Sequence, residues 1–249
     1  MLQRLGLAYR ARRYKTHHDP REIAELLRRT PRGGVALDIG AHKGAYTYWL
    51  RKGVGAGGRV IAVEPQGELA AALGAIYRGD PGVRVRHGAV AGATGTATLR
   101  IPGEGPSHGA SIRTHDDDDG SSPVREREVD AWTLGDLAAD EGLERLDVIK
   151  CDCEGAELDI FRAGVGVLER LRPVVLVECE RRHAEGTDDP VRDLAGVFAG
   201  LGYEGFCVFD GSMVPIDAFG YDRHQRDPRD KRRYGNNFLF TPGPCTPRG

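Results

Sequence analysis

Short apolar runs alternate with amphipathic stretches along most of the chain, and this alternation predicts parallel strands connected by helices. The clearest unit starts at Val35, where an apolar run ends in Asp38 and is followed by a glycine turn and a helix-forming stretch from Ala45. We predict further strands at 59–63, 83–87, 146–150 and 174–177. The helices are predicted at about 45–53, 66–78, 156–171 (broken near Gly164 and Gly166) and 190–201.

The last two predicted strands, 206–209 and 238–240, have no helix between them, so the final strand should lie antiparallel to its neighbours. The fold class is therefore α/β, with a Rossmann-like, mostly parallel sheet of seven strands and helices on both faces. Two strand-like pieces, 96–101 and 124–129, flank a Gly/Ser/Asp-rich loop at 102–123 that contains Asp116–Asp119, and an amphipathic helix is predicted at 132–142. A second long loop, rich in charge, covers 219–235.

Residues 1–34 stand apart as a predicted helical cap on a single catalytic domain, 35–249. Asp19 precedes Pro20 and a helical pattern, as an N-cap residue does. The cap starts with a basic segment whose members are Arg4, Arg10, Arg12, Arg13 and Lys15. Two interpretations stay open for this segment: a solvated helical face, or a lid that meets an anionic substrate.

Composition and charge narrow the class of protein. The 249 residues carry a formal net charge of −2, which gives no overall attraction to nucleic acid or anionic membrane. No apolar run approaches the roughly 18 residues that span a bilayer, and the basic N-terminus lacks the apolar core of a signal peptide. The five cysteines form no C-x-x-C pair, so we expect them to be reduced and the protein to be cytoplasmic. The richness in Gly, Ala and Arg suggests a bacterial source.

The first glycine turn indicates the cofactor. It reads D-x-G-x-x-x-G, from Asp38 through Gly40 to Gly44, and lacks the G-x-G-x-x-G of a dinucleotide site. An acid before the glycines suits the positively charged amino acid end of S-adenosylmethionine (SAM). Glu64 ends the next strand about twenty residues later, where nucleotide-binding folds place an acid on the ribose. An NAD(P)-binding oxidoreductase is the alternative, as is an Asp38 that only caps the helix.

Acids also close two later strands, at Asp152 and Glu178. Ligands of such sheets bind outside the C-terminal ends of the strands. We therefore expect Asp38, Glu64, Asp152 and Glu178 to gather at one edge of the sheet.

Four segments resemble blocks of the FkbM-type methyltransferases: LDIGAHKGAYT, HGAVAGATGTATL, IKCDCEGAELDIFRAG and NNFLFTP, spread between about residues 35 and 242. The second departs from the usual block, because Ala91 and Gly92 replace a Ser-Asp pair. The resemblance implies a class I, SAM-dependent O-methyltransferase that acts on a hydroxyl of a sugar or natural product. The residues expected to bind SAM are Asp38, Gly40, His42, Gly44, Thr47, Glu64, Ala89 and Asp152.

Two catalytic routes stay open, because an alcohol needs either a general base or a metal ion to become nucleophilic. His183 is the first candidate base, followed by His42 and His108. The metal route resembles the site of catechol-type O-methyltransferases and assigns Asp152, Glu154 and Glu178 to Mg²⁺, which prefers oxygen ligands. Asp152 and Glu154 are also catalytic candidates, and Lys150 is either catalytic or a salt-bridge partner.

The expected partner is a small-molecule hydroxyl acceptor, sugar or polyketide-like, with an anionic or carrier-linked form left open. No nucleic acid or membrane is expected, and a homodimer stays open. Transfer to nitrogen or to RNA is the alternative within the same enzyme class; the turn Asp152–Gly155 lacks the Asn/Asp-Pro-Pro-Tyr pattern of nitrogen methylation, and the basic segments carry few aromatics.

Overall fold

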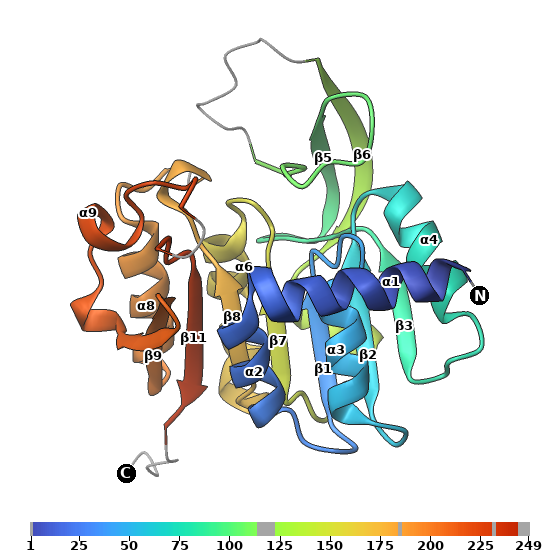
Figure 1. The fold of residues 1–249 in the computed structure, drawn as a ribbon, viewed down its shortest axis with the longest axis horizontal. Coiled ribbons are helices and arrows are strands. Elements are labelled where there is room, and N and C mark those ends of the chain that lie inside the picture. Colours follow the sequence, from blue (N-terminus) through green and yellow to red (C-terminus); the bar gives the residue numbers. More distant parts are fainter. Residues whose placement is uncertain (1, 114–122, 184–185, 231–232, 244–249) are drawn as a thin grey trace.

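The structure is a computed structural model that describes residues 2–113, 123–183, 186–230 and 233–243. Its main sheet (Figure 1) is built from β1 (Val35–Ile39), β2 (Arg59–Glu64), β3 (Val83–His87), β7 (Val148–Cys151), β8 (Val174–Glu178), β9 (Tyr203–Phe209), β10 (Ser212–Pro215) and β11 (Asn237–Pro242). The strand order is β10-β9-β11-β8-β7-β1-β2-β3. The pairs β8-β7, β7-β1, β1-β2 and β2-β3 are parallel, which confirms the predicted α/β class.

The antiparallel end of the sheet differs from the prediction by one strand. β11 inserts antiparallel between β8 and β9, as expected. The eighth strand, β10, pairs antiparallel with β9 at the sheet edge. Its four residues include only two large apolar side chains, Met213 and Val214, and so short an alternation carries almost no signal.

A smaller sheet of three strands stands beside the main one. It contains β4 (Ala89–Val90), β5 (Gly95–Pro102) and β6 (Val124–Trp132) in the order β4-β6-β5. The antiparallel pair β5-β6 extends away from the main sheet in Figure 1. The predicted strand pieces at 96–101 and 124–129 are confirmed, whereas Asp116–Asp119 lie outside the described residues.

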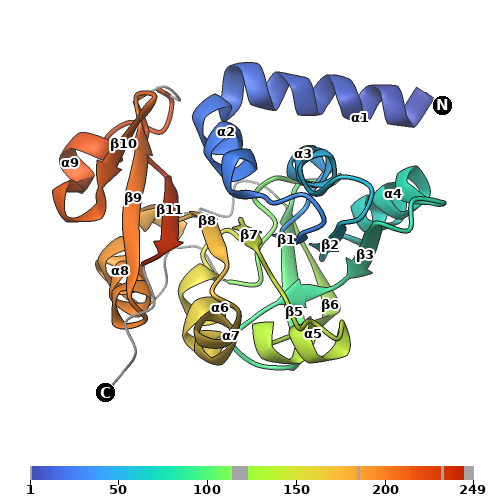
Figure 2. The ribbon, with the colours of Figure 1, turned by 90° about the horizontal axis from the view of Figure 1, so that it is seen from below.

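Helices cover both faces of the main sheet, as Figure 2 shows. One face carries α1 (Leu2–Arg13), α2 (Pro20–Arg29), α3 (Ala45–Val54) and α4 (Gly67–Tyr77). The other carries α5 (Leu134–Asp140), α6 (Glu157–Ala163), α7 (Val165–Leu171) and α8 (Pro190–Gly200), while the short α9 (Tyr221–His224) lies near β10. The predicted break near Gly164 is confirmed, because α6 ends and α7 begins there.

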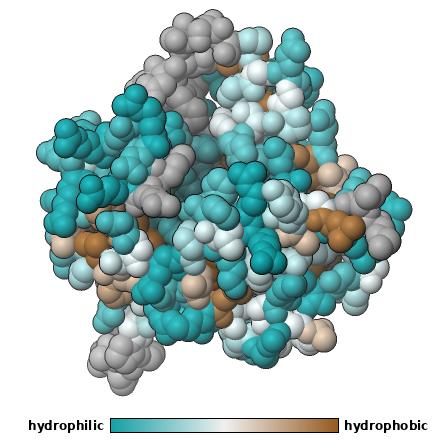
Figure 3. Space-filling model, viewed as in Figure 1, coloured by the Kyte–Doolittle hydropathy of each residue, from teal (hydrophilic) through white to brown (hydrophobic). Residues whose placement is uncertain are grey.

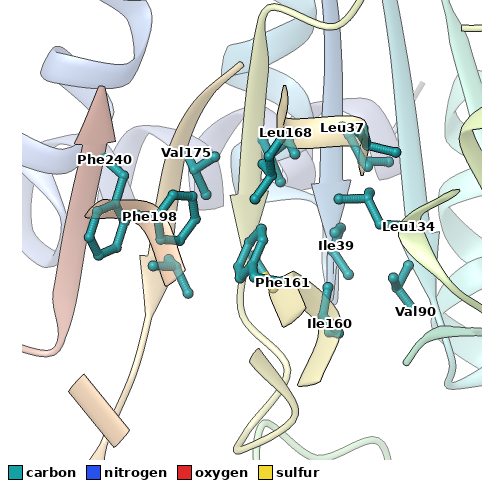
Figure 4. Packing of buried hydrophobic residues seen from close by; sticks show 14 of the residues in the cluster. Leu37, Ile39, Val90, Leu134, Ile160, Phe161, Leu168, Val175, Phe198 and Phe240 are labelled. Carbon is teal, nitrogen blue, oxygen red and sulfur yellow. The ribbon is translucent and has the colours of Figure 1, made fainter. Parts of the chain in front are cut away.

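The largest apolar core lies between the sheet and α5–α8 (Figure 4). Phe198 of α8 is fully buried and stacks on Phe240 of β11 with ring centroids 4.0 Å apart. Phe161 of α6 contacts the same ring from the other side at 5.1 Å. This packing fixes α6 and α8 against β7, β8 and β11, and so fixes the turns that follow these strands.

The N-terminal segment packs on the opposite face, where Ile23 and Leu26 of α2 are buried against Leu50 of α3 and Leu176 of β8. A single turn of π-helix, Tyr14–His18, connects α1 to α2. No helix in the described ranges is long and apolar enough to cross a membrane.

Candidate functional site

Four carboxylates mark the C-terminal ends of four neighbouring strands. Glu178 ends β8, Asp152 follows the last residue of β7, and Asp38 and Glu64 lie at the ends of β1 and β2. They line two adjoining cavities, of about 910 Å³ and about 60 Å³. Both cavities are bordered by Gly40, His42, His108, Asp152 and Glu154. The predicted gathering of acids at one edge of the sheet is present in the structure.

The turn after β1 fits closely against the turn after β7. Gly40 has φ +74°, and a Cβ added there would lie 1.8 Å from the backbone oxygen of Asp152. Only glycine tolerates both that conformation and that approach. Glu64 holds the same turn, because its carboxylate accepts hydrogen bonds from the backbone amides of His42 at 2.6 Å and of Gln66 at 2.8 Å.

Gly40→Ala is therefore expected to lower the free energy of unfolding by at least the roughly 1–3 kcal/mol that strained backbone costs. The matched control is Gly74→Ala. Gly74 lies inside α4, and an added Cβ meets nothing within 4 Å, so alanine there should stabilise by about 0.5–1 kcal/mol. Urea unfolding of both variants measures the difference; a Gly40→Ala protein as stable as wild type would contradict this account of the turn.

Asp38 lies on the floor of the larger cavity with 1 % of its surface exposed. Burial raises the pKa of its carboxyl to about 6, although a hydrogen bond from the Thr47 hydroxyl and the charge of Lys150 oppose the shift. Thr47 is thus behind Asp38 rather than in the cavity lining. Gly44 is likewise outside both linings and serves as the left-handed residue before α3.

The smaller cavity extends between β2 and the smaller sheet. Its lining is mostly apolar, with Ile39, Val63, Ala89, Val90, Leu99 and Ile112, and includes the Glu64 carboxylate. Segment 107–112 makes it narrow. Gln66 exchanges two hydrogen bonds of 2.9 Å with the backbone of Ser107, and the Ser111 hydroxyl donates to the backbone oxygen of Glu154.

The turn after β7 is organised by Glu157, which is buried at the start of α6. Its carboxylate accepts hydrogen bonds from the amides of Cys153 at 2.7 Å and Gly155 at 2.9 Å. Gly155 has φ +104°, and a Cβ there would lie 2.1 Å from the backbone oxygen of His183. The turn after β7 is thus packed between the turn after β1 and the turn after β8.

The cysteines of this turn have a packing role, as predicted. Cys151 is fully buried in the main core and Cys153 packs against it. The four cysteines within the described residues are free, and Cys245 lies outside them.

His183 and Glu154 form a pair at the wall of the larger cavity. His183 Nδ1 lies 2.7 Å from Glu154 Oε2. Burial lowers the pKa of His183, but the hydrogen bond and the charge of Glu154 outweigh it, so the pKa is raised above the ordinary 6.5. Glu154 has φ +52°, a strained conformation that often marks functional sites. Glu154 follows β7 and His183 follows β8, and these two strands pair with each other in the sheet.

The other two candidate bases, His42 and His108, contact each other, with ring centroids 3.8 Å apart and ring planes tilted by 49°. Burial lowers the pKa of His42 to about 3, and the charges of His108 and Lys43 add to the effect. His42 is therefore neutral at ordinary pH and much too weak a base to deprotonate an alcohol. This argues against His42 as the general base, while its place in both cavities is compatible with ligand binding.

Lys150 of β7 carries a buried ammonium whose charge acts on the strand-end carboxylates Asp152 and Glu178. It is 98 % buried, since only 2 % of its surface is exposed. Burial opposes its charge, but Asp152, Glu178 and Asp19 outweigh this and raise the pKa of the ammonium. Among the described residues, no group of three or more His, Cys, Asp or Glu side chains is placed to hold a metal ion. The predicted Mg²⁺ set of Asp152, Glu154 and Glu178 is therefore not assembled, because Glu154 is bonded to His183 and Lys150 supplies the positive charge.

Residues that the sequence analysis did not assign complete the larger cavity. The N-terminal segment contributes Tyr14, Asp19 and Glu22, and β11 begins with Asn237 at the same edge. Asp19 occupies the N-cap position of α2 but makes no side-chain cap bond. The predicted N-cap position of Asp19 is confirmed, while its carboxylate accepts a 2.9 Å hydrogen bond from the Tyr46 hydroxyl.

Asn236 connects two acids beside Asn237. Its Nδ2 donates to Glu178 and, at 3.0 Å, to Glu180, and Glu180 also pairs with Arg182 and accepts from the Tyr234 hydroxyl. A signal for the asparagines exists in the sequence: an antiparallel strand starts at the edge where parallel strands end, so polar residues before Phe238 face the site. No comparable signal exists for Asp19 and Glu22, whose positions depend on how α2 docks.

Comparison with known proteins gives one family match. Residues 38–204, more than half of the chain, match the family model described as "Methyltransferase FkbM domain". No curated protein sequence matches.

Solved structures match at low identity. The methyltransferase FkbM from Methylobacillus flagellatus KT is 15 % identical, with 83 % of this chain and 43 % of that chain covered and a TM-score of 0.52. The chain thus spans less than half the length of that protein, and the match describes the shared fold. An O-methyltransferase from Bacillus cereus, in complex with SAH, is 14 % identical over 96 % of this chain and 90 % of its own, with a TM-score of 0.49.

Proposed function

The chain belongs to the FkbM methyltransferase family, and from this premise we propose that it moves the methyl group of SAM to a hydroxyl of a small molecule. One observation carries the proposal: carboxylates at the ends of four adjacent strands line two joined cavities. A long ligand with a nucleoside at one end and a charged amino acid at the other suits such a site. Membership in a methyltransferase family removes the oxidoreductase alternative.

The residues present fit SAM in charge and polarity. We assign the nucleoside to the smaller, mostly apolar cavity, with Glu64 toward the ribose, and the ammonium end to Asp38. Segment 107–112 forms one wall of that cavity, through Ser107, His108, Ala110 and Ile112. When bound, SAM supplies an electrophilic methyl group on its sulfonium.

The base in this proposal is His183. Glu154 holds Nδ1, so the imidazole is oriented for Nε2 to receive the acceptor proton while the acceptor oxygen takes the methyl group. Asp152 borders both cavities and therefore lies where donor and acceptor meet. Burial raises the pKa of Glu178, and the buried ammonium of Lys150 opposes that rise.

We propose the metal-independent route, and expect activity to persist in excess EDTA. The reason is twofold: the charge of Lys150 acts on Asp152 and Glu178, and Glu154 is paired with His183, so the three carboxylates proposed for Mg²⁺ already have other partners. Turnover is measured with labelled SAM after dialysis against EDTA and again after Mg²⁺ is restored. Loss of turnover in EDTA and recovery with Mg²⁺ would contradict the metal-independent route and would indicate that these carboxylates bind a metal ion.

The acceptor in this proposal is a sugar or natural product, and an anionic or carrier-linked part would lie at the cavity mouth. Arg10 and Arg13 of α1 and Lys43 of the first turn line the cavity there. Figure 3 shows a mostly hydrophilic face in the same view as Figure 1, in which α1 crosses the front. Nitrogen and RNA acceptors remain the alternatives. An assay with labelled SAM distinguishes them from a hydroxyl acceptor, because it shows which compound receives the labelled methyl group.

The experiment that tests the function has two steps. Calorimetry with SAM and SAH tests the donor site, and labelled SAM with a panel of hydroxyl, amine and RNA acceptors tests the transfer. We expect binding of both SAM and SAH, and label on a hydroxyl oxygen. A chain that binds neither would overturn the proposal, and label on RNA or nitrogen alone would replace the acceptor.

A further inference from the structure

The lining of the larger cavity includes hydrogen-bonding atoms that nothing in the described protein satisfies. In the described ranges, five buried side-chain atoms have no hydrogen-bond partner, and three of them belong to residues that line this cavity: Glu22 Oε2, His42 Nε2 and Asn237 Oδ1. Buried polar atoms are normally paired, and an unpaired one costs about 1–3 kcal/mol. Their concentration in one cavity indicates a ligand that pairs with them.

Two of these atoms specify what the ligand must offer. Glu22 Oε2 is a carboxylate oxygen and Asn237 Oδ1 an amide oxygen, so both only accept hydrogen bonds. Asn237 is 96 % buried, since 4 % of its surface is exposed, and its Nδ2 is already used by Asn236 at 3.3 Å. The ligand group in this part of the cavity must donate hydrogen bonds, which excludes a purely hydrocarbon or aromatic surface.

The local charge adds a second requirement. Asp19 and Glu22 lie one helical turn apart at the start of α2, and Glu178 lines the same cavity. Neither Asp19 nor Glu22 forms an ion pair within the described residues. Two arginines that line the cavity have partners other than these acids. Arg10 donates a hydrogen bond to the backbone oxygen of Lys43, and Arg182 forms an ion pair with Glu180. Among the described residues that line the cavity, Lys150 is the one buried ammonium, whereas Asp19, Glu22 and Glu178 supply three carboxylates.

The electrostatic state of these acids agrees with a missing cation. Burial raises the pKa of Glu22 to about 7, and the nearby Asp19 raises it further. Burial also raises the pKa of Asp19, while Lys150 opposes the shift. A buried carboxylate in this condition gains most from a positive partner that also donates hydrogen bonds.

We propose that the acceptor substrate carries a protonated amine, and that Glu22, Asp19 and Asn237 hold this amine inside the cavity while a hydroxyl of the same molecule receives the methyl group. The inference rests on the proposed function, because it assumes that the methyl acceptor binds here. It narrows the acceptor class to amino alcohols, among them amino sugars. An acidic group on the same molecule would remain outside, near Arg10 and Arg13.

The test is an affinity selection on SAH-saturated protein. The library holds polar small molecules in matched sets, each amino alcohol with its N-acetyl form and with the hydroxyl compound that lacks the amine: glucosamine, N-acetylglucosamine and glucose are one such set. Mass spectrometry measures what the protein retains. On the wild type we expect at least one amine to be retained at least about tenfold over its counterparts, a difference of about 1.4 kcal/mol.

Matched variants locate the effect. Glu22→Gln keeps the shape and removes the charge, so the amine preference should fall below about threefold, and Asp19→Asn should act in the same direction. Glu204→Gln removes a carboxylate from the exposed part of β9 and should retain the wild-type preference. The inference is overturned if no amine is enriched, if N-acetyl forms are retained equally, or if Glu22→Gln keeps the preference.

SAH calorimetry on each protein separates this inference from the function itself. Unchanged SAH affinity in Glu22→Gln shows that the variant is folded and that Glu22 does not hold the donor. A large loss of SAH affinity in Glu22→Gln would assign the carboxylate to the ammonium of the donor and reject the acceptor site. A wild-type protein that fails to bind SAH would reject the proposed function, whereas intact SAH binding without amine selection rejects only the inference.

Discussion

Asp38→Ala is expected to abolish measurable SAM binding. The carboxylate is buried on the cavity floor, where the proposed donor presents its ammonium, and truncating one member of a buried charge pair costs about 3–5 kcal/mol. That range corresponds to an affinity loss of roughly 10²-fold or more. Calorimetry with SAM measures it directly, and an unchanged dissociation constant would mean that the turn after β1 does not bind the donor.

Two further variants separate charge from packing. Asp38→Asn keeps the shape and should still lose most of the affinity, because the charge is removed. Thr47→Val removes the hydroxyl that donates a hydrogen bond to Asp38. The variant should weaken SAM binding by about 1 kcal/mol, the ordinary value of one hydrogen bond. Circular dichroism of each variant confirms that the fold is retained.

The same carboxylate makes SAM binding dependent on pH. The pKa of Asp38 is raised to about 6 by burial, so the group is ionised above pH 6 and becomes protonated as pH falls through that value. A protonated carboxyl attracts an ammonium much less strongly, and affinity should therefore fall below about pH 6. Asp38→Asn should show no such change.

The sequence predicted the parts of this site that depend on local pattern. The strand ending in Asp38, the glycine at 40 and the helix from Ala45 belong to one contiguous unit, and the structure has them at the expected residues. The acids Glu64, Asp152 and Glu178 follow from the same rule, because each closes a strand of a parallel sheet. These predictions needed only the assignment of strands, which apolar runs provide.

The parts that were not predicted depend on how distant segments dock. Glu22 reaches the cavity because α2 packs on β8 and α3 through Ile23 and Leu26, and no local pattern encodes that direction. Glu154 was assigned to a metal from its two-residue spacing to Asp152, but the turn gives it φ +52° and places it on His183. A two-residue spacing predicts a common direction only in an extended strand, and this segment is a tight turn.

The surroundings of Lys150 also depend on how distant segments dock. In an isolated strand, Lys150 and Asp152 are neighbours on one side, which predicts a salt bridge as readily as a metal site. The third carboxylate near Lys150, Asp19, comes from the N-terminal segment, and only the tertiary structure shows that the ammonium has three acids around it. The choice between the two catalytic routes was therefore not contained in the spacing of the acids.

His183→Ala is expected to reduce kcat by about 10²- to 10⁴-fold, the usual contribution of a general base. SAM affinity should change little, because His183 is not among the residues assigned to the donor. Turnover is measured with labelled SAM and the acceptor found in the panel. A variant that retains wild-type kcat would exclude His183 as the base.

Glu154→Gln gives the sharper test, since it keeps a hydrogen-bond acceptor for His183 Nδ1 and removes the charge. Glu154 raises the pKa of His183 above 6.5, and a base works only when deprotonated, so wild-type kcat should rise with pH through a value above 6.5. Without the negative charge the pKa of His183 falls, and the rising limb should move to lower pH. Comparing the pH dependence of kcat in the wild type and in Glu154→Gln therefore tests the His183–Glu154 pair. If the rise of kcat occurs at the same pH in both proteins, another group takes the proton.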